Sequence, residues 1–177
     1  STPYDAKGLL KAAIRDDNPV VFIEHQLCYT ERDEVPEEEY TIPIGVARVA
    51  REGTDITVVA YSYMYWMAMK AAEMAAEEGI SVEVVDPRTL RPLDVDTLAA
   101  SVNKTGRLLV VQQAPLVGCY GGHICYAVQE RCFAQMKAPA RIVAAHDVPP
   151  PMAATLEREN IPSPERILHN IREMVGR

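Results

Sequence analysis

The segment from Ser81 to Asp94 constrains the fold of this chain more than any other stretch. An apolar run that ends at Asp86 is followed at once by prolines at positions 87 and 92. Proline cannot donate a hydrogen bond to a neighbouring strand, so a paired central strand has to end near Asp86. Asp94 then precedes a helical pattern and is suited to accept hydrogen bonds from its first amides. The segment therefore predicts a strand, a turn across one edge of a sheet, and a new helix.

Strand and helix patterns alternate from about residue 44 to the end. Short apolar runs predict strands over 46–49, 56–60, 82–85, 108–111 and 141–144. Helical patterns follow 56–60, 82–85 and 108–111, and another begins at Pro164 after the N-cap Ser163. Such alternation is typical of a parallel sheet covered by helices on both faces, whereas the short turn at 51–55 predicts an antiparallel pair between the strands beside it. We expect a three-layer α/β/α fold with a mostly parallel sheet of about five strands and one antiparallel edge strand.

The first 43 residues follow a different pattern. Apolar positions between Ala6 and Arg15 predict a helix, and Val20–Ile23 predicts a short strand after the break at Asn18-Pro19. Residues 31–43 are rich in acidic side chains and proline, which is typical of an extended, solvated linker. This part therefore looks like one helix and strand of an α/β domain, joined by a linker to the alternating region.

Composition excludes several classes of function. The 25 acidic residues outnumber the 18 basic ones, which argues against binding to nucleic acid. No apolar run approaches the roughly 20 residues that span a bilayer, and the start carries no signal-peptide pattern, so we expect a protein of the cytoplasm or the mitochondrial matrix and no membrane contact. The four cysteines lack the CxxC spacing of zinc sites, so we interpret them as packing residues and expect no metal site in this chain.

Candidate site residues follow from the predicted sheet, because parallel sheets bind ligands beyond the carboxyl ends of their strands. That rule nominates Tyr61, Ser62, Asp86, Arg88, Gln112, Gln113, His146 and Asp147. None of them forms a known catalytic motif. The loop Gly118–His123 precedes a helix and its amides offer a possible anion site, but a loop that lets a helix approach the sheet closely is the favoured interpretation. We interpret His123 and His146 as helix-start or loop residues.

Several longer stretches resemble one enzyme family. Residues 3–24, Val84–Asp94, Lys104–Val111 and Asp147–Pro149 are similar to the beta subunit of thiamine diphosphate-dependent 2-oxo acid or acetoin dehydrogenases. The resemblance is to the carboxyl-terminal half of that subunit. It implies that residues 1–30 are the last helix and strand of a pyrimidine-binding domain, that 31–43 are a linker, and that 44–177 form a transketolase carboxyl-terminal domain.

The resemblance also implies a function outside this chain. Enzymes of this family are heterotetramers of two alpha and two beta subunits that use thiamine diphosphate and magnesium and pass an acyl unit to an acyltransferase. The activating glutamate and the diphosphate site belong to parts that this chain lacks, so the resemblance implies no catalytic, cofactor-binding or metal-binding residue here, in place of the strand-end candidates. It implies roles in subunit packing and in docking of the acyltransferase's peripheral subunit-binding domain, with Lys137 and Arg177 as docking residues.

Some choices stay open at the level of sequence. Lys137 replaces an acidic residue of pyruvate-type and branched-chain-type relatives and is found in acetoin-type ones, whereas Arg91–Asp94 resembles the former. The substrate therefore remains pyruvate, a branched-chain 2-oxo acid or acetoin. One alternative is a freestanding α/β domain that binds a phosphorylated metabolite or nucleotide at residues 118–123. Another is a purely structural fragment that associates with its own kind through exposed apolar surface.

Overall fold

The computed structural model of the chain describes residues 1–176. The predicted docking residue Arg177 lies outside the described residues. In chain order the elements are α1 (Pro3–Arg15), η1 (Gln26–Thr30), β1 (Arg48–Arg51), β2 (Ile56–Ala60), α2 (Tyr63–Glu77), β3 (Val82–Asp86), α3 (Val95–Thr105), β4 (Leu108–Pro115), α4 (Tyr120–Cys132), η2 (Phe133–Gln135), β5 (Arg141–Ala145), α5 (Ala154–Asn160) and α6 (Pro164–Val175).

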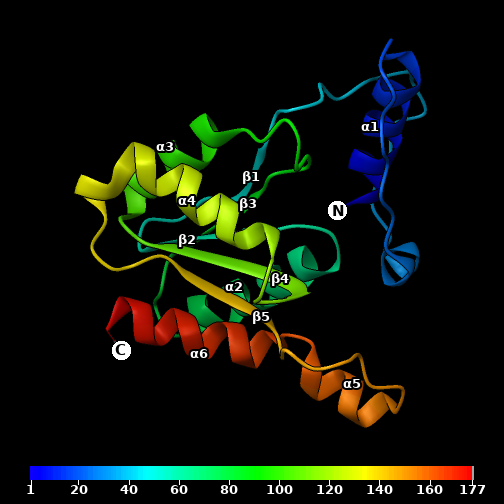
Figure 1. The fold of residues 1–177 in the computed structure, drawn as a ribbon. Helices are drawn as coiled ribbons and strands as arrows, with labels where there is room; N and C mark the ends of the chain where they lie inside the picture. Colours follow the sequence, from blue (N-terminus) through cyan, green and yellow to red (C-terminus); the bar gives the residue numbers. More distant parts are fainter. Residues whose placement is uncertain (177) are drawn as a thin grey trace.

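The sheet has the predicted class of architecture. Its five strands run in the order β1-β3-β2-β4-β5, and every neighbouring pair is parallel except β1 with β3. Helices α2 and α6 lie on one side of the sheet, and α3 and α4 lie on the other (Figure 1). The expected three-layer α/β/α fold with one antiparallel edge strand is confirmed.

Two hydrophobic cores explain why the strands are continuously apolar. Alternate residues of a strand point to opposite faces, so Val58 joins the core under α2 and α6 while Val59 joins the core under α3 and α4. All five residues of β2 are buried. A strand covered on both faces has no polar side, which is the pattern that predicted a parallel sheet.

The helix ends follow the sequence signals. Asp94 accepts a hydrogen bond from the Thr97 amide at 3.0 Å and another from the Ala47 amide at 2.9 Å. Burial alone would raise the pKa of the Asp94 carboxyl, but these hydrogen bonds together lower it below its usual value. At the last helix, the Ser163 hydroxyl accepts from the Arg166 amide, and Pro164 is the first helical residue. The predicted caps are confirmed.

The predicted hairpin between 46–49 and 56–60 is wrong. Strand β1 pairs with β3, not with β2, and β3 lies between them. The connection passes tightly over the start of β3, because a Cβ built on Gly53 would lie 2.2 Å from the Glu83 nitrogen and from the Val82 carbonyl carbon. Only glycine lets the backbones approach so closely, and that approach carries the chain across β3 instead of into a hairpin turn.

The predicted strand Val20–Ile23 is also absent. These residues are irregular, and the side chains of Val21 and Ile23 are 86% and 80% exposed. A β-strand needs a neighbour to pair its backbone groups. Within residues 1–176 no strand lies beside this segment, so its apolar pattern finds no sheet to join.

The segment expected to be a solvated linker packs against α1 at its far end. Ile42 is buried over Gly8, whose carbonyl accepts a hydrogen bond from the Ile42 amide at 3.1 Å. The Tyr40 ring stacks on Tyr4 with 4.6 Å between ring centroids. Residues 40–42 therefore pack against α1 and are not a free linker. The acidic composition of the segment gave no indication of the contacts that Tyr40 and Ile42 make.

Two of the four cysteines are buried in a hydrophobic core. Cys125 and Cys132 are buried in the core under α3 and α4, which confirms their packing role. Burial raises the pKa of the Cys125 thiol to about 11, so the group is a thiol and not a thiolate at neutral pH.

Among the helices of residues 1–176, none is long and apolar enough to cross a membrane.

Candidate functional site at the carboxyl edge of the sheet

The residues after β3 form a buried cluster of charges. Asp86 is fully buried, and its Oδ1 accepts a hydrogen bond from the Arg88 amide at 2.9 Å. Arg88 has a φ of 58°, a conformation that side chains other than glycine seldom adopt. This backbone aims the Arg88 guanidinium at the buried carboxylate of Asp5 in α1, with 2.8 Å between Nη2 and Oδ1. The predicted candidates Asp86 and Arg88 are therefore in direct contact, and Arg88 also binds Asp5, a residue that the sequence did not nominate.

The residues after β2 are held by neighbouring segments. Ser62 also has a positive φ, 57°, and its amide donates a hydrogen bond to the Ser1 hydroxyl at 2.9 Å. Burial raises the pKa of the neighbouring Tyr61 hydroxyl to about 12. Tyr61 therefore stays protonated at neutral pH and is unsuited to act as a general base.

Gln112 and Gln113 lie within β4, near its carboxyl end, beside the crevice where an open sheet of this kind usually binds ligands. The chain winds to one side after β2 and returns to the other side in β4, so the crevice lies between these strand ends. His25 occupies it, with Nε2 at 2.7 Å from Oε1 of Gln113 and its ring stacked on Tyr63 at 5.4 Å between centroids. The crevice is thus covered by the chain's own segment, and His25 was not among the predicted candidates.

The glycine loop at 118–123 serves packing. The fully buried Gln112 accepts a hydrogen bond from the Gly121 amide at 2.8 Å, and its Nε2 donates to the carbonyls of Ala114 and Pro115. A Cβ built on Gly121 would lie 2.6 Å from the Gln112 Oε1. The Gly121 amide, which an anion site would need, already donates to Gln112. Glycine at this position is also required for the close approach of α4 to β4. Both observations favour the packing interpretation over the phosphate-binding alternative.

Substitution of this glycine tests the packing interpretation. We expect Gly121→Ala to lower the free energy of unfolding by roughly 1–3 kcal/mol, because the added methyl group displaces a buried, hydrogen-bonded glutamine. The adjacent Gly122 has no atom within 4 Å of a built Cβ, so Gly122→Ala is the matched control and should be neutral or slightly stabilising. Urea unfolding followed by circular dichroism measures both; equal stability of the two variants would contradict the packing role.

The residues after β5 lie apart from the other candidates. His146 and Asp147 are exposed, and the His146 amide donates a hydrogen bond to the Asn160 side chain at 3.0 Å. His146 borders a shallow depression of about 330 Å³ lined mainly by Val148, Pro149, Pro151 and Leu156. The eight strand-end candidates therefore do not converge on one catalytic arrangement. Over residues 1–176, no group of three or more His, Cys, Asp or Glu side chains is placed to hold a metal ion.

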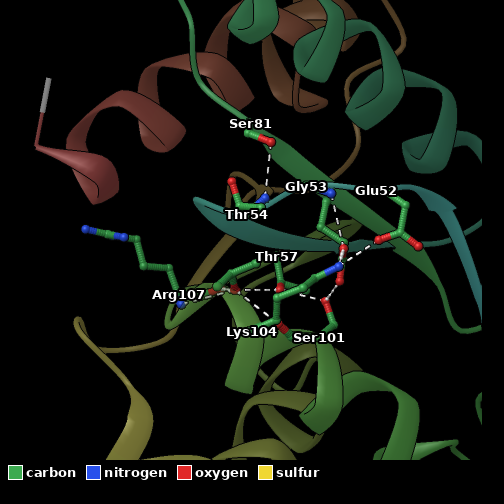
Figure 2. A network of polar contacts seen from close by, with 10 residues as sticks. Glu52, Gly53, Thr54, Thr57, Ser81, Ser101, Lys104 and Arg107 are labelled. Carbon is green, nitrogen blue, oxygen red and sulfur yellow. Dashed lines mark hydrogen bonds and ion pairs between the residues drawn. The ribbon is translucent and has the colours of Figure 1, made fainter.

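A second buried polar cluster lies at the opposite, amino edge of the sheet (Figure 2). Glu83 is 1% exposed and accepts hydrogen bonds from the Ser101 hydroxyl at 2.5 Å and from the Gly53 amide at 3.2 Å. Oε2 of Glu83 also forms an ion pair with Lys104, which binds the exposed Glu52 as well. The Thr57 hydroxyl extends the cluster, because it lies within hydrogen-bond distance of the hydroxyls of both Ser101, at 2.7 Å, and Thr105, at 2.8 Å. These contacts join the connection between β1 and β2 to β2, β3 and α3, which is a structural role.

Lys137 also lies at the amino edge. Its side chain is exposed but runs over Gly106, and its Nζ lies 3.4 Å from the Thr105 carbonyl at the end of α3. The Lys137 amide donates to the Gly106 carbonyl at 2.8 Å. A cation in this position interacts favourably with the partial negative charge at the carboxyl end of α3. Lys137 thus has a local structural contact, and its docking role stays a prediction.

Comparisons with known proteins agree with this geometry. The sequence model of the "Transketolase, C-terminal domain" family matches residues 45–167. The chain is 46% identical over 176 residues to the "Pyruvate dehydrogenase E1 component subunit beta" of Bacillus subtilis, covering 99% of this chain and 54% of the relative. It is 51% identical over 148 residues to the subunit of the same name from Staphylococcus aureus, covering 83% of this chain and 46% of the relative. The chain thus spans about half the length of these relatives.

A solved structure gives the same result for the fold. The structure described as "Split gene transketolase, inactive beta4 tetramer" superposes with a TM-score of 0.65 at 25% sequence identity, over 81% of this chain and 46% of that chain. The family match covers more than half of the present sequence and includes all five strands of the sheet. The chain therefore belongs to the transketolase C-terminal domain family.

Proposed function

We propose that this chain is the carboxyl-terminal part of the beta subunit of a pyruvate dehydrogenase E1 component. The observation that carries the proposal is the 46% identity to a beta subunit of that enzyme over 176 residues, which extends beyond the family domain into residues 1–44. The fold alone would not support this choice, because one fold serves many activities. Pyruvate is thus favoured over a branched-chain 2-oxo acid or acetoin.

The chain's own residues do not fit a thiamine diphosphate site. In this family the cofactor would supply the reactive carbon, with magnesium holding its diphosphate. Within residues 1–176, His25 bridges the two sides of the crevice at the switch in winding through Gln113 and Tyr63, and the Gly121 amide is bound by Gln112. We therefore assign no catalytic or cofactor-binding residue to this chain, and we propose that catalysis requires the rest of the beta subunit and the alpha subunit.

The first 30 residues support a role in assembly. We propose that residues 1–30 complete a pyrimidine-binding domain, that 31–43 connect the two domains, and that 44–177 form the transketolase carboxyl-terminal domain. Ile14, Val21 and Ile23 are each at least 75% exposed, although all three are apolar. A surface of this kind is typical of an interface with a further domain or subunit. The alpha subunit and a second beta subunit are the proposed partners.

Docking of the acyltransferase component is the remaining part of the proposal. Lys137, at the amino edge of the sheet, and Arg177 are the proposed docking residues for its peripheral subunit-binding domain. The exposed position of Lys137 beside the end of α3 supports this assignment. A partner that approaches here meets a positive charge, so we expect an acidic residue opposite Lys137.

Calorimetry tests the proposal that the thiamine diphosphate site lies outside this chain. We expect titration of thiamine diphosphate with magnesium into the chain alone to give no binding heat. Micromolar binding of the cofactor would contradict the proposal that its site lies elsewhere. A parallel titration with a panel of nucleotides and inorganic phosphate examines the glycine-loop alternative, and silence across that panel is the expected result.

A further inference from the structure

Helix α1 is attached to the rest of the molecule at one end. In Figure 1 it stands apart from the helices that cover the sheet. Among the described elements, α1 packs extensively against no other helix or strand. The face of α1 that includes Leu10 and Ile14 is exposed. Elsewhere on its surface, α1 contacts the segment around Tyr40 and Ile42. The position of α1 over the sheet therefore depends on a few contacts at its amino end. These are the contacts of its first turn and those of Ser1, whose hydroxyl and carbonyl accept hydrogen bonds from Ser62 and Trp66 of the α2 region.

One carboxylate makes the central contact of that turn. Asp5 is fully buried and lies between two arginines, at 2.8 Å from Nη2 of Arg88 and at 3.5 Å from Nη2 of Arg48. The Thr2 hydroxyl donates a further hydrogen bond to Asp5 at 2.8 Å and also caps the helix. Thus α1 meets the sheet through a buried ion cluster and not through a broad apolar surface.

The sheet holds the two arginines in place. Arg48 in β1 and Asp86 in β3 are direct partners in the antiparallel pair, and Arg88 follows two residues later with its unusual φ of 58°. Arg48 also donates a hydrogen bond to the Tyr65 hydroxyl at 3.1 Å. The cluster contains two acids and two arginines, and the Ser1 ammonium lies 3.9 Å from Oδ2 of Asp86. We name Asp5, Arg48, Asp86 and Arg88 the charge latch.

The charge latch is only partly satisfied. Within residues 1–176, the Nε atoms of Arg48 and Arg88 and the Oδ2 atom of Asp86 have no hydrogen-bond partner. A buried ionic network of this kind contributes little net stability when complete, but loss of one member leaves an uncompensated buried charge. An isolated helix the length of α1 is also only marginally stable in water. Loss of the Asp5 charge should therefore act locally, on the helix that the latch holds.

We propose that the charge latch fixes the orientation of α1 and of the segment packed on it over the carboxyl edge of the sheet, and that it opens as a unit without unfolding the sheet. The latch is a conformational device independent of the proposed enzyme activity, since it rests only on contacts within this chain. Whatever packs on the exposed face of α1 would be positioned by Asp5.

Hydrogen exchange on the full chain tests the latch. Asp5→Asn keeps the shape and the cap but removes the charge, and we expect amides of α1 to exchange at least about tenfold faster while those of β2 and β4 keep their protection. The matched control is Arg15→Gln, which removes the exposed ion pair of the same helix with Glu39 and should change nothing. The double variant Asp5→Asn with Arg88→Met should recover part of the protection, because the unpaired buried charge is gone.

Three results would overturn the latch. The first is unchanged exchange of α1 in Asp5→Asn. The second is an equal rise in exchange across α1, β2 and β4, which would make Asp5 a general stability residue. The third is an effect of Arg15→Gln as large as that of Asp5→Asn, which would show that any charge removed from α1 releases it.

Discussion

Gly53→Ala should lower the free energy of unfolding by about 3 kcal/mol, and the melting temperature by roughly 6–12 °C. The added Cβ would lie 2.2 Å from the Glu83 nitrogen and from the Val82 carbonyl carbon. Both are backbone atoms of β3, whose residues are all buried and which pairs with a strand on each side. The collision therefore cannot be relieved by a side-chain rotation, and the connection between β1 and β2 has to move. Urea unfolding monitored by circular dichroism measures the change.

The neighbouring position provides the control for this substitution. Thr54 lies in the same connection and is exposed, and its backbone amide makes the hydrogen bonds to Ser81 at 3.2 and 3.1 Å. Thr54→Ala keeps that amide and should change stability by no more than about 0.5 kcal/mol. If Gly53→Ala were as mild as Thr54→Ala, the close approach of the two backbones would not be a constraint on the fold.

Glu83→Ala should be the second large effect, with a loss of about 2–4 kcal/mol. The substitution removes the acceptor for the buried Gly53 amide and for the Ser101 hydroxyl, and it leaves a cavity in the cluster drawn in Figure 2. Lys104 contributes less to this loss, because its side chain is 41% exposed and its charge remains solvated. Thermal and urea unfolding both report the difference from the unsubstituted chain.

A second acid bound to the same lysine separates burial from charge. Glu52 pairs with Lys104 but is exposed, so Glu52→Gln should change stability by less than about 1 kcal/mol. The Lys104 ammonium lowers the pKa of the Glu52 carboxyl through a hydrogen bond, yet that surface contact is screened by water. If Glu83→Ala and Glu52→Gln lowered the free energy of unfolding equally, the buried hydrogen bonds of Glu83 would contribute nothing to stability.

Local signals were sufficient for most of the fold. Prolines 87 and 92 ended β3 where proline chemistry requires, and Asp94 and Ser163 capped their helices through the expected hydrogen bonds. Continuous apolar runs predicted the parallel sheet because a strand covered on both faces has no polar side. These features depend on neighbours in the sequence, so they can be inferred from the sequence alone.

Features that depend on distant contacts were missed. The antiparallel partner of β1 is decided by the tight crossing at Gly53, and the apolar pattern of Val20–Ile23 gives no strand because a strand needs a neighbour. Asp5 was not among the residues that the sequence nominated. Its burial between two arginines arises only when β1 and β3 pair, so no local signal could identify it. The same holds for His25, whose partner Gln113 is 88 residues away.

The proposal that this chain is half of a pyruvate dehydrogenase beta subunit is tested most directly by a chimera. The carboxyl-terminal half of the Bacillus subtilis beta subunit is replaced by this chain, and the product is assembled with the alpha subunit of the same enzyme. Decarboxylation of pyruvate is then measured with thiamine diphosphate and magnesium present. We expect activity in the assembled chimera and none in the chain alone. A chimera that assembles with the alpha subunit but does not decarboxylate pyruvate would contradict the assignment.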